Sequence, residues 1–188
     1  MTILDLRASK EAQMKTVVVY ESMFGNTRSI ANAIAEGLVG AGEVVVGSVD
    51  DLSPHEVGDA GLLVAGGPTH GHGMARPNAH QAMAKDGSYA KYGPVLEGEE
   101  SLRGWLERLP AGRAAAAAFD TRFAKPRWLT GSAATKIAQR LGHKGYSIIE
   151  TESFFVQTSG GPLADGERER AAAWGRALAA NLHPTTAT

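Results

Sequence analysis

The sequence predicts an α/β fold, a three-layer, doubly wound arrangement in which helices cover both faces of a five-stranded parallel sheet. Short apolar runs rich in β-branched residues, such as Val17-Val18-Val19-Tyr20, alternate along the chain with segments of helical apolar spacing. Such runs are typical of parallel strands that are buried on both faces. No internal repeat or Pro/Ser-rich linker divides the 188 residues, so we expect one domain with a substantial core.

The order of the elements follows from these runs and from the turn residues between them. The expected strands cover residues 17–20, 43–49, 61–66, 113–119 and 146–149, and the last continues at 154–156. The expected helices cover residues 28–38, 74–84, 101–109, 133–141 and 164–182. Five alanines at 114–118 favour a helix by propensity, but their place between two helical patterns favours a strand. Residues 66–73 and 120–129 are expected as loops, and residues 85–100 as an irregular surface insertion.

The ends of the chain and its composition narrow the class of protein. Residues 1–14 read as a loose N-terminal extension and residues 15–183 as the folded domain. The net charge is −1, with 19 Lys and Arg against 20 Asp and Glu, which gives no sign of nucleic-acid binding. There is no cysteine, so disulfides and thiolate-bound metal clusters are excluded. No apolar run approaches the ~20 residues of a membrane span and no secretory signal is visible, so we expect a cytoplasmic protein.

The most informative stretch is Ser22–Thr27, which lies between the first strand and an amphipathic helix. A helix N-terminus exposes unpaired N–H groups and a partial positive charge, and Ser22, Asn26 and Thr27 add side-chain donors. The chain lacks both the G-x-G-x-x-G fingerprint and the P-loop lysine, so a single phosphate monoester fits this loop better than a phosphate chain. The alternative is an ordinary strand-to-helix turn with a polar cap.

The residues Ser22-Met23-Phe24-Gly25-Asn26-Thr27 resemble the FMN-phosphate loop of the flavodoxin family, Thr/Ser-x-Thr/Ser-Gly-Asn-Thr. Phe24 departs from that pattern, because a hydroxyl residue is usual at its position. The resemblance implies strand order 2-1-3-4-5, with FMN bound where the strand order reverses. It assigns the phosphate to Ser22, Met23, Phe24, Gly25, Asn26 and Thr27.

Two further loops are implicated by the same resemblance. Pro68-Thr69-His70-Gly71 is similar to the family's Pro-Thr-x-Gly, which contacts one face and the N5 edge of the flavin ring, and His70 stands where an aromatic residue often stacks. Asp120-Thr121-Arg122 would border the pyrimidine, and either Phe123 or Trp128 would supply a stacking aromatic. A metal site at His70, His72 and His80 is disfavoured, because residues 60–85 contain no carboxylate.

The resemblance implies a flavoprotein that carries electrons between redox partner proteins. One alternative is an FMN-dependent NAD(P)H:quinone oxidoreductase acting on a small quinone-type acceptor, and another is a relative that has lost its flavin. Short-chain flavodoxins are strongly acidic and use that charge to find basic partners, whereas this chain is nearly neutral. The run Glu167–Arg170 reads as a solvated helix face, and the oligomeric state stays open.

Overall fold

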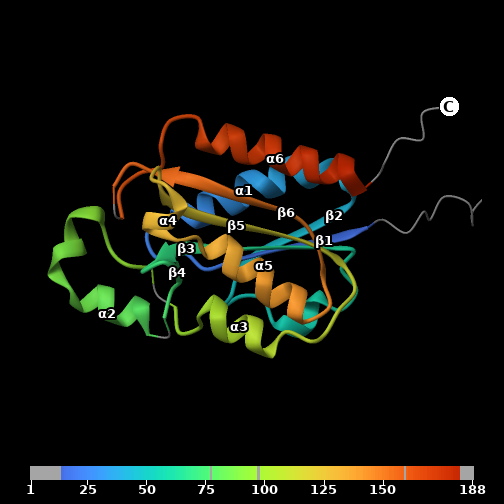
Figure 1. Ribbon diagram of the computed structural model, residues 1–188, viewed down its shortest axis with the longest axis horizontal. Helices are drawn as coiled ribbons and strands as arrows, with labels where there is room; N and C mark the ends of the chain where they lie inside the picture. The colour runs from blue at the N-terminus through green and yellow to red at the C-terminus, as the bar shows by residue number, and fades with distance from the viewer. Residues whose placement is uncertain (1–13, 77, 97, 159, 183–188) are drawn as a thin grey trace, which may run out of the picture.

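The computed structural model describes residues 14–76, 78–96, 98–158 and 160–182, and it has a parallel sheet between two layers of helices (Figure 1). The strands lie in the order β2 (Glu43–Ser48), β1 (Lys15–Tyr20), β3 (Leu62–His70), β5 (Ala115–Phe123), β6 (Ser147–Val156), and all four pairings are parallel. A two-residue strand, β4 (Gly73–Met74), pairs antiparallel with the end of β3. Apart from β4, this is the predicted five-stranded order. The predicted extension falls outside the described residues, except for Met14.

Two helices cover each face of the sheet. Helices α1 (Asn26–Leu38) and α6 (Glu167–Leu182) lie on one face, and α3 (Leu102–Arg108) and α5 (Ala133–His143) lie on the other (Figure 1). Shorter helices, α2 (Ala79–Lys85) and α4 (Arg127–Thr130), lie at the edge where the strands end (Figure 1). The 3-10 turns are η1 (Val39–Ala41), η2 (Pro54–Val57) and η3 (Gly87–Tyr92). In the part of the chain described, no helix is long and apolar enough to cross a membrane.

The valine run of β1 shows why the strand needs cover on both sides. Val17 and Val19 belong to the cluster that includes Trp105 and Ile137, on the face covered by α3 and α5. Val18 belongs to the opposite cluster, with residues of α1 and α6. All three valines are 1% exposed or less, as a strand with period two requires in a doubly covered sheet.

The close crossing of α1 and α6 depends on two glycines that face each other. A Cβ atom on Gly37 would lie 2.2 Å from the carbonyl oxygen of Ala172, and a Cβ on Gly175 would lie 2.3 Å from that of Ile34. No side chain fits at these distances. The two glycines therefore set how near α6 approaches α1.

Strands β3 and β5 are longer than the sequence predicts, so two predicted loop boundaries are wrong. β3 runs on to His70 rather than ending at Gly66, and β5 runs on to Phe123 instead of ending at Phe119. The two extensions pair with each other, Gly67 with Asp120 and Pro68 with Thr121. Each extension is stabilised by the other, a long-range pairing that local turn signals do not reveal.

Three other predictions also need correction. β6 is one strand without a break, and the polar stretch at its centre is tolerated because β6 is an edge strand of the sheet. The helix predicted at 74–84 covers only Ala79–Lys85, because Met74 pairs in β4.

The charged run Glu167–Arg170 packs against β6. Glu167 is 8% exposed and accepts a hydrogen bond from the Phe155 N–H at 2.7 Å. Arg170 donates to Ser153 and lies over the Phe154 ring. That charged run is therefore not simply a solvated face.

Candidate functional site

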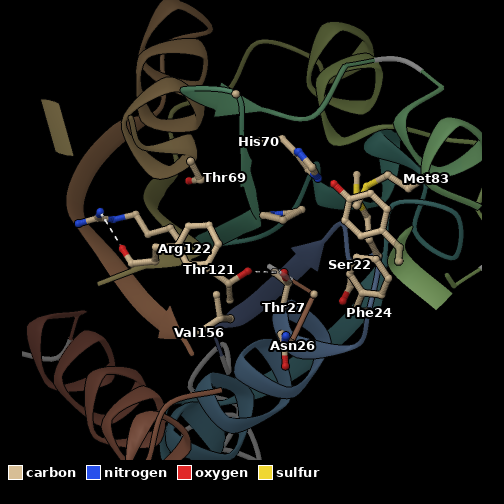
Figure 2. Close-up of a pocket in the computed structure, with 16 residues that line it drawn as sticks. Ser22, Phe24, Asn26, Thr27, Thr69, His70, Met83, Thr121, Arg122 and Val156 are labelled. Carbon is tan, nitrogen blue, oxygen red and sulfur yellow. Dashed lines mark hydrogen bonds between the residues drawn. The ribbon is translucent and has the colours of Figure 1, made fainter. Parts of the chain in front are cut away.

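A cavity of about 220 Å³ opens at the carboxyl ends of β1, β3 and β5 (Figure 2). Eleven of the thirteen predicted cofactor-binding residues line it, namely Ser22, Met23, Phe24, Asn26, Thr27, Pro68, Thr69, His70, Gly71, Thr121 and Arg122. Five others complete the lining, namely Met83, Tyr89, Phe123, Val156 and Gly160. The predicted residues Gly25 and Asp120 lie outside the lining. The structure thus brings the three predicted loops together.

The loop before α1 forms a cradle of backbone donors. Gly25 has φ 87°, a left-handed conformation that glycine adopts readily, and its N–H donates to Ser22 Oγ at 3.1 Å. Among the described residues, no acceptor lies within hydrogen-bonding range of the N–H groups of Asn26, Thr27 and Arg28. These donors lie at the positive end of a 13-residue helix, an arrangement whose chemistry suits an anion.

The side chains of Asn26 and Thr27 tie this loop to its neighbours. Asn26 Nδ2 donates to the carbonyl oxygen of Gly161 at 2.6 Å, and the Thr27 and Thr121 hydroxyls share a hydrogen bond of 2.9 Å, drawn in Figure 2. Thr27 is 2% exposed and Thr121 is 5% exposed. The two side chains therefore hold the cradle in register with β5 and with the turn that follows β6.

The walls of the cavity away from the cradle are mainly apolar or neutral. Phe123 and Val156 are among the lining residues. His70 lies across the cavity from Arg122 in Figure 2. Burial is the main cause that lowers the pKa of His70 below its usual value of 6.5, so the imidazole is neutral at pH 7. Trp128, the other aromatic considered for stacking, is 82% exposed and does not line the cavity. Phe123 is thus the aromatic placed at the site.

Asp120 supports the cavity from behind, whereas Arg122 lines the cavity and is held in place by bonds to the neighbouring turn. Asp120 is fully buried, and its Oδ2 accepts bonds from Thr69 Oγ1, Ser132 Oγ and the Ala134 N–H at 2.7–3.0 Å. It therefore joins the ends of β3 and β5 to the start of α5. Arg122 is 7% exposed and donates through Nη1 to the carbonyl oxygens of Phe123 and Lys125 and to Thr130 Oγ1. Arg122 thus fixes the turn into α4.

The segment after β4 forms a further wall that sequence reasoning missed. Phe24 stacks on Tyr89 with ring centroids 5.8 Å apart and 22° between planes, and it meets the edge of Tyr92 at 6.3 Å. Met83 packs in the same cluster. Phe24, the departure from the family pattern, therefore holds η3 over the cavity. The two tyrosines in the expected insertion were the available signal for this contact.

A buried ion pair anchors the same segment to the sheet. His80 Nε2 lies 3.2 Å from Glu21 Oε1, and His80 Nδ1 lies 3.1 Å from the Leu96 carbonyl oxygen. Both ring nitrogens face acceptors, so the protonated imidazolium fits this place, and the hydrogen bond to Glu21 raises the pKa of His80. Within the described ranges, no three His, Asp or Glu side chains gather in a metal-binding group. His80 thus has a structural partner of its own.

Known protein families and solved structures that resemble this chain have the same fold. A family model described as Flavodoxin matches residues 18–174. The chain is similar to flavodoxin 2 from Bacillus cereus in its oxidised form, with 22% identity over 89% of this chain and 99% of that one and a TM-score of 0.62. A flavodoxin from the domain Archaea has 20% identity, coverage of 90% and 99%, and a TM-score of 0.59. A flavodoxin from Streptococcus pneumoniae TIGR4 has 17% identity, coverage of 89% and 99%, and a TM-score of 0.60. No curated protein matches the chain.

Proposed function

Because the chain belongs to the flavodoxin family, we propose that it binds one FMN non-covalently and carries electrons between redox partner proteins. The observation that carries the proposal is the set of N–H groups of Asn26, Thr27 and Arg28, which have no hydrogen-bond acceptor among the described residues, at the start of a helix whose first two residues line the cavity. These neutral donors suit a phosphate monoester, and the cavity beyond them offers apolar walls for a flat ring.

The residues of this chain fit the cofactor in both of its parts. The N–H groups at the start of α1 and the Ser22–Gly25 turn would hold the phosphate, while His70 and Phe123 would border the ring. FMN, when bound, supplies a ring system that accepts and releases electrons. The neutral imidazole of His70 adds no charge to that wall at pH 7.

The exposure of the cavity mouth favours a carrier. Gly71 lines the cavity and is exposed, so the site reaches the surface beside the β3–β4 turn. At about 220 Å³, the cavity is smaller than the roughly 300–1,000 Å³ of a site that encloses its ligand. A carrier needs only an exposed flavin edge. Hydride transfer requires in addition a nicotinamide C4 held roughly 3–3.5 Å from flavin N5 in an aligned pose.

Stopped-flow mixing of the FMN-loaded protein with NADH and with NADPH tests the carrier assignment. We expect flavin reduction far slower than the ~1–1,000 per second of ordinary enzymes. A separate flavin reductase added to the same mixture should reduce the bound flavin readily. Rapid bleaching by either nucleotide alone, followed by quinone-dependent turnover, would assign the protein to the quinone oxidoreductases instead.

A further inference from the structure

The charges of this chain are separated along the sequence in a way that the net charge conceals. Residues 60–85 and 121–149 contain eight of the 19 Lys and Arg residues and none of the 20 Asp and Glu residues. The rest of the chain holds the other 11 cations and all 20 carboxylates. The first of the two segments contains β3, β4 and α2, and the second contains the end of β5, all of α4 and α5, and the start of β6. Both segments therefore contribute to the cavity.

The fold gathers four of these cations around the mouth of the cavity. Lys125 and Arg127 follow Phe123, which lines the cavity, and Arg76 shares a surface depression with His70 and Gly71. Lys136 lies against Gly73, and a backbone bridge between His72 and Gly131 joins the β3–β4 turn to the start of α5. Figure 1 shows α4 beside the ends of β3 and β5. We name these four cations, with Trp128 and Leu129, the basic rim.

The basic rim is exposed, and its charges are not neutralised by neighbouring carboxylates. Arg76, Lys125, Arg127 and Lys136 are all exposed, and none forms an ion pair with another described residue. Asp120, the carboxylate nearest in sequence to α4, is fully buried and committed to Thr69, Ser132 and Ala134. The rim therefore carries a local excess of positive charge, although the molecule has a net charge of −1.

Two apolar side chains lie among these charges. Trp128 is 82% exposed and Leu129 is 48% exposed, and both belong to α4. Tryptophan and arginine are, with tyrosine, the residues enriched at the energetic centres of protein interfaces. An exposed tryptophan flanked by cations at the cavity mouth therefore suits a protein surface better than it suits a small anion.

We propose that the basic rim is the docking surface for an acidic electron-transfer protein, which places that partner's redox centre next to the flavin. This proposal rests on the proposed function, because it names the partner class of the same site. This charge pattern is the reverse of that of the short-chain flavodoxins, whose acidic charge attracts basic partners. Complementary charge would steer the acidic protein to the cavity mouth, and Trp128 would be buried on contact.

Tryptophan quenching tests the positive field independently of any flavin. Trp105 is fully buried and Trp174 is 6% exposed, so ions in solution reach mainly Trp128. For the full chain, with and without FMN, the ratio of iodide to caesium quenching should be about two- to fivefold above that of N-acetyltryptophanamide. The double variant K125E/R127E should bring the ratio to or below that reference. A wild-type ratio equal to the reference would overturn the positive field.

Binding to an acidic plant-type [2Fe–2S] ferredoxin tests the docking surface itself, with basic cytochrome c as the opposite probe. At low salt, the FMN-loaded protein should bind the ferredoxin more tightly than cytochrome c, and K125E/R127E should weaken ferredoxin binding about tenfold or more. Replacing Trp128 by Ala should also weaken it. Arg113→Glu is the matched control, because Arg113 is exposed and precedes β5 at the opposite edge of the sheet. It should change the affinity by less than about twofold.

Three outcomes would overturn the docking proposal. The first is ferredoxin binding that K125E/R127E and R113E weaken equally. The second is an affinity for duplex DNA that equals the affinity for ferredoxin and is weakened by K125E/R127E to the same extent. The third is rapid NADPH-dependent flavin reduction that K125E/R127E abolishes, which would assign the rim to a nucleotide. Failure of FMN binding together with intact, rim-dependent ferredoxin binding would contradict the proposed cofactor while supporting the basic rim.

Discussion

Replacing Asp120 by Ala should lower the free energy of unfolding by about 3–5 kcal/mol and weaken FMN binding in the protein that remains folded. The carboxylate is fully buried, and one oxygen accepts three hydrogen bonds, from Thr69, Ser132 and the Ala134 N–H. Alanine leaves all three donors without that acceptor in a place that water does not reach. It also removes the negative charge 3.9 Å from the Arg122 guanidinium.

The effect of Asp120→Ala on the cofactor follows from what its partners do. Thr69 lines the cavity, and Thr121, Arg122 and Phe123 follow Asp120 directly on β5. We expect FMN affinity to fall about tenfold, as for the loss of one net hydrogen bond. Urea unfolding measures the stability, and fluorescence titration with FMN at low urea measures the affinity. Asp120→Asn, which keeps one acceptor oxygen, should lose less of both. A change in stability below about 1 kcal/mol for Asp120→Ala would contradict this role.

Replacing Gly175 by Leu should destabilise the fold by about 3 kcal/mol without changing FMN affinity. Any Cβ at this position would meet the Ile34 carbonyl oxygen at 2.3 Å, so α6 must move away from α1 to admit the side chain. Ala173→Leu is the control, because Ala173 lies on the exposed side of the same helix and leucine is a good helix former. It should change the stability by less than about 0.5 kcal/mol. Equal stability of the two variants in urea unfolding would contradict the close crossing.

The pair Asp120→Ala and Gly175→Leu separates the site from the scaffold. Both changes remove several kcal/mol of stability, but only the first touches residues that line the cavity. A loss of FMN affinity in both folded variants would mean that affinity simply follows global stability. A loss confined to Asp120→Ala would locate the support of the cavity at β3, β5 and the start of α5.

The parts of the fold encoded by local patterns were predictable from the sequence. The valines of β1, the apolar stripe of α1 and the Ser22–Thr27 loop each carry their own signal, and the sheet order that the resemblance implied is confirmed. The sequence did not decide whether Phe123 or Trp128 is the aromatic residue at the site. The structure distinguishes them, because β5 continues through Phe123 and the chain then turns outward into α4.

The features that prediction missed depend on contacts between distant segments. β3 and β5 extend because each pairs with the other, and no local turn residue announces that pairing. Phe24 meets Tyr89 across 65 residues of sequence, so an apparent departure from the phosphate-loop pattern turned out to be a packing residue. Glu167 and Arg170 look like surface charges in the sequence, yet they bond to β6 at Phe155 and Ser153.

Isothermal titration calorimetry of the purified chain with FMN and with riboflavin is the most direct test of the central claim. The two ligands share the ring and differ at the phosphate, which the free N–H groups of Asn26, Thr27 and Arg28 would bind. Three charge-assisted hydrogen bonds at about 1.5 kcal/mol each correspond to an affinity ratio of about a thousandfold. We therefore expect one FMN per chain, bound about a thousandfold more tightly than riboflavin. Equal affinities, or no binding of FMN, would contradict the account.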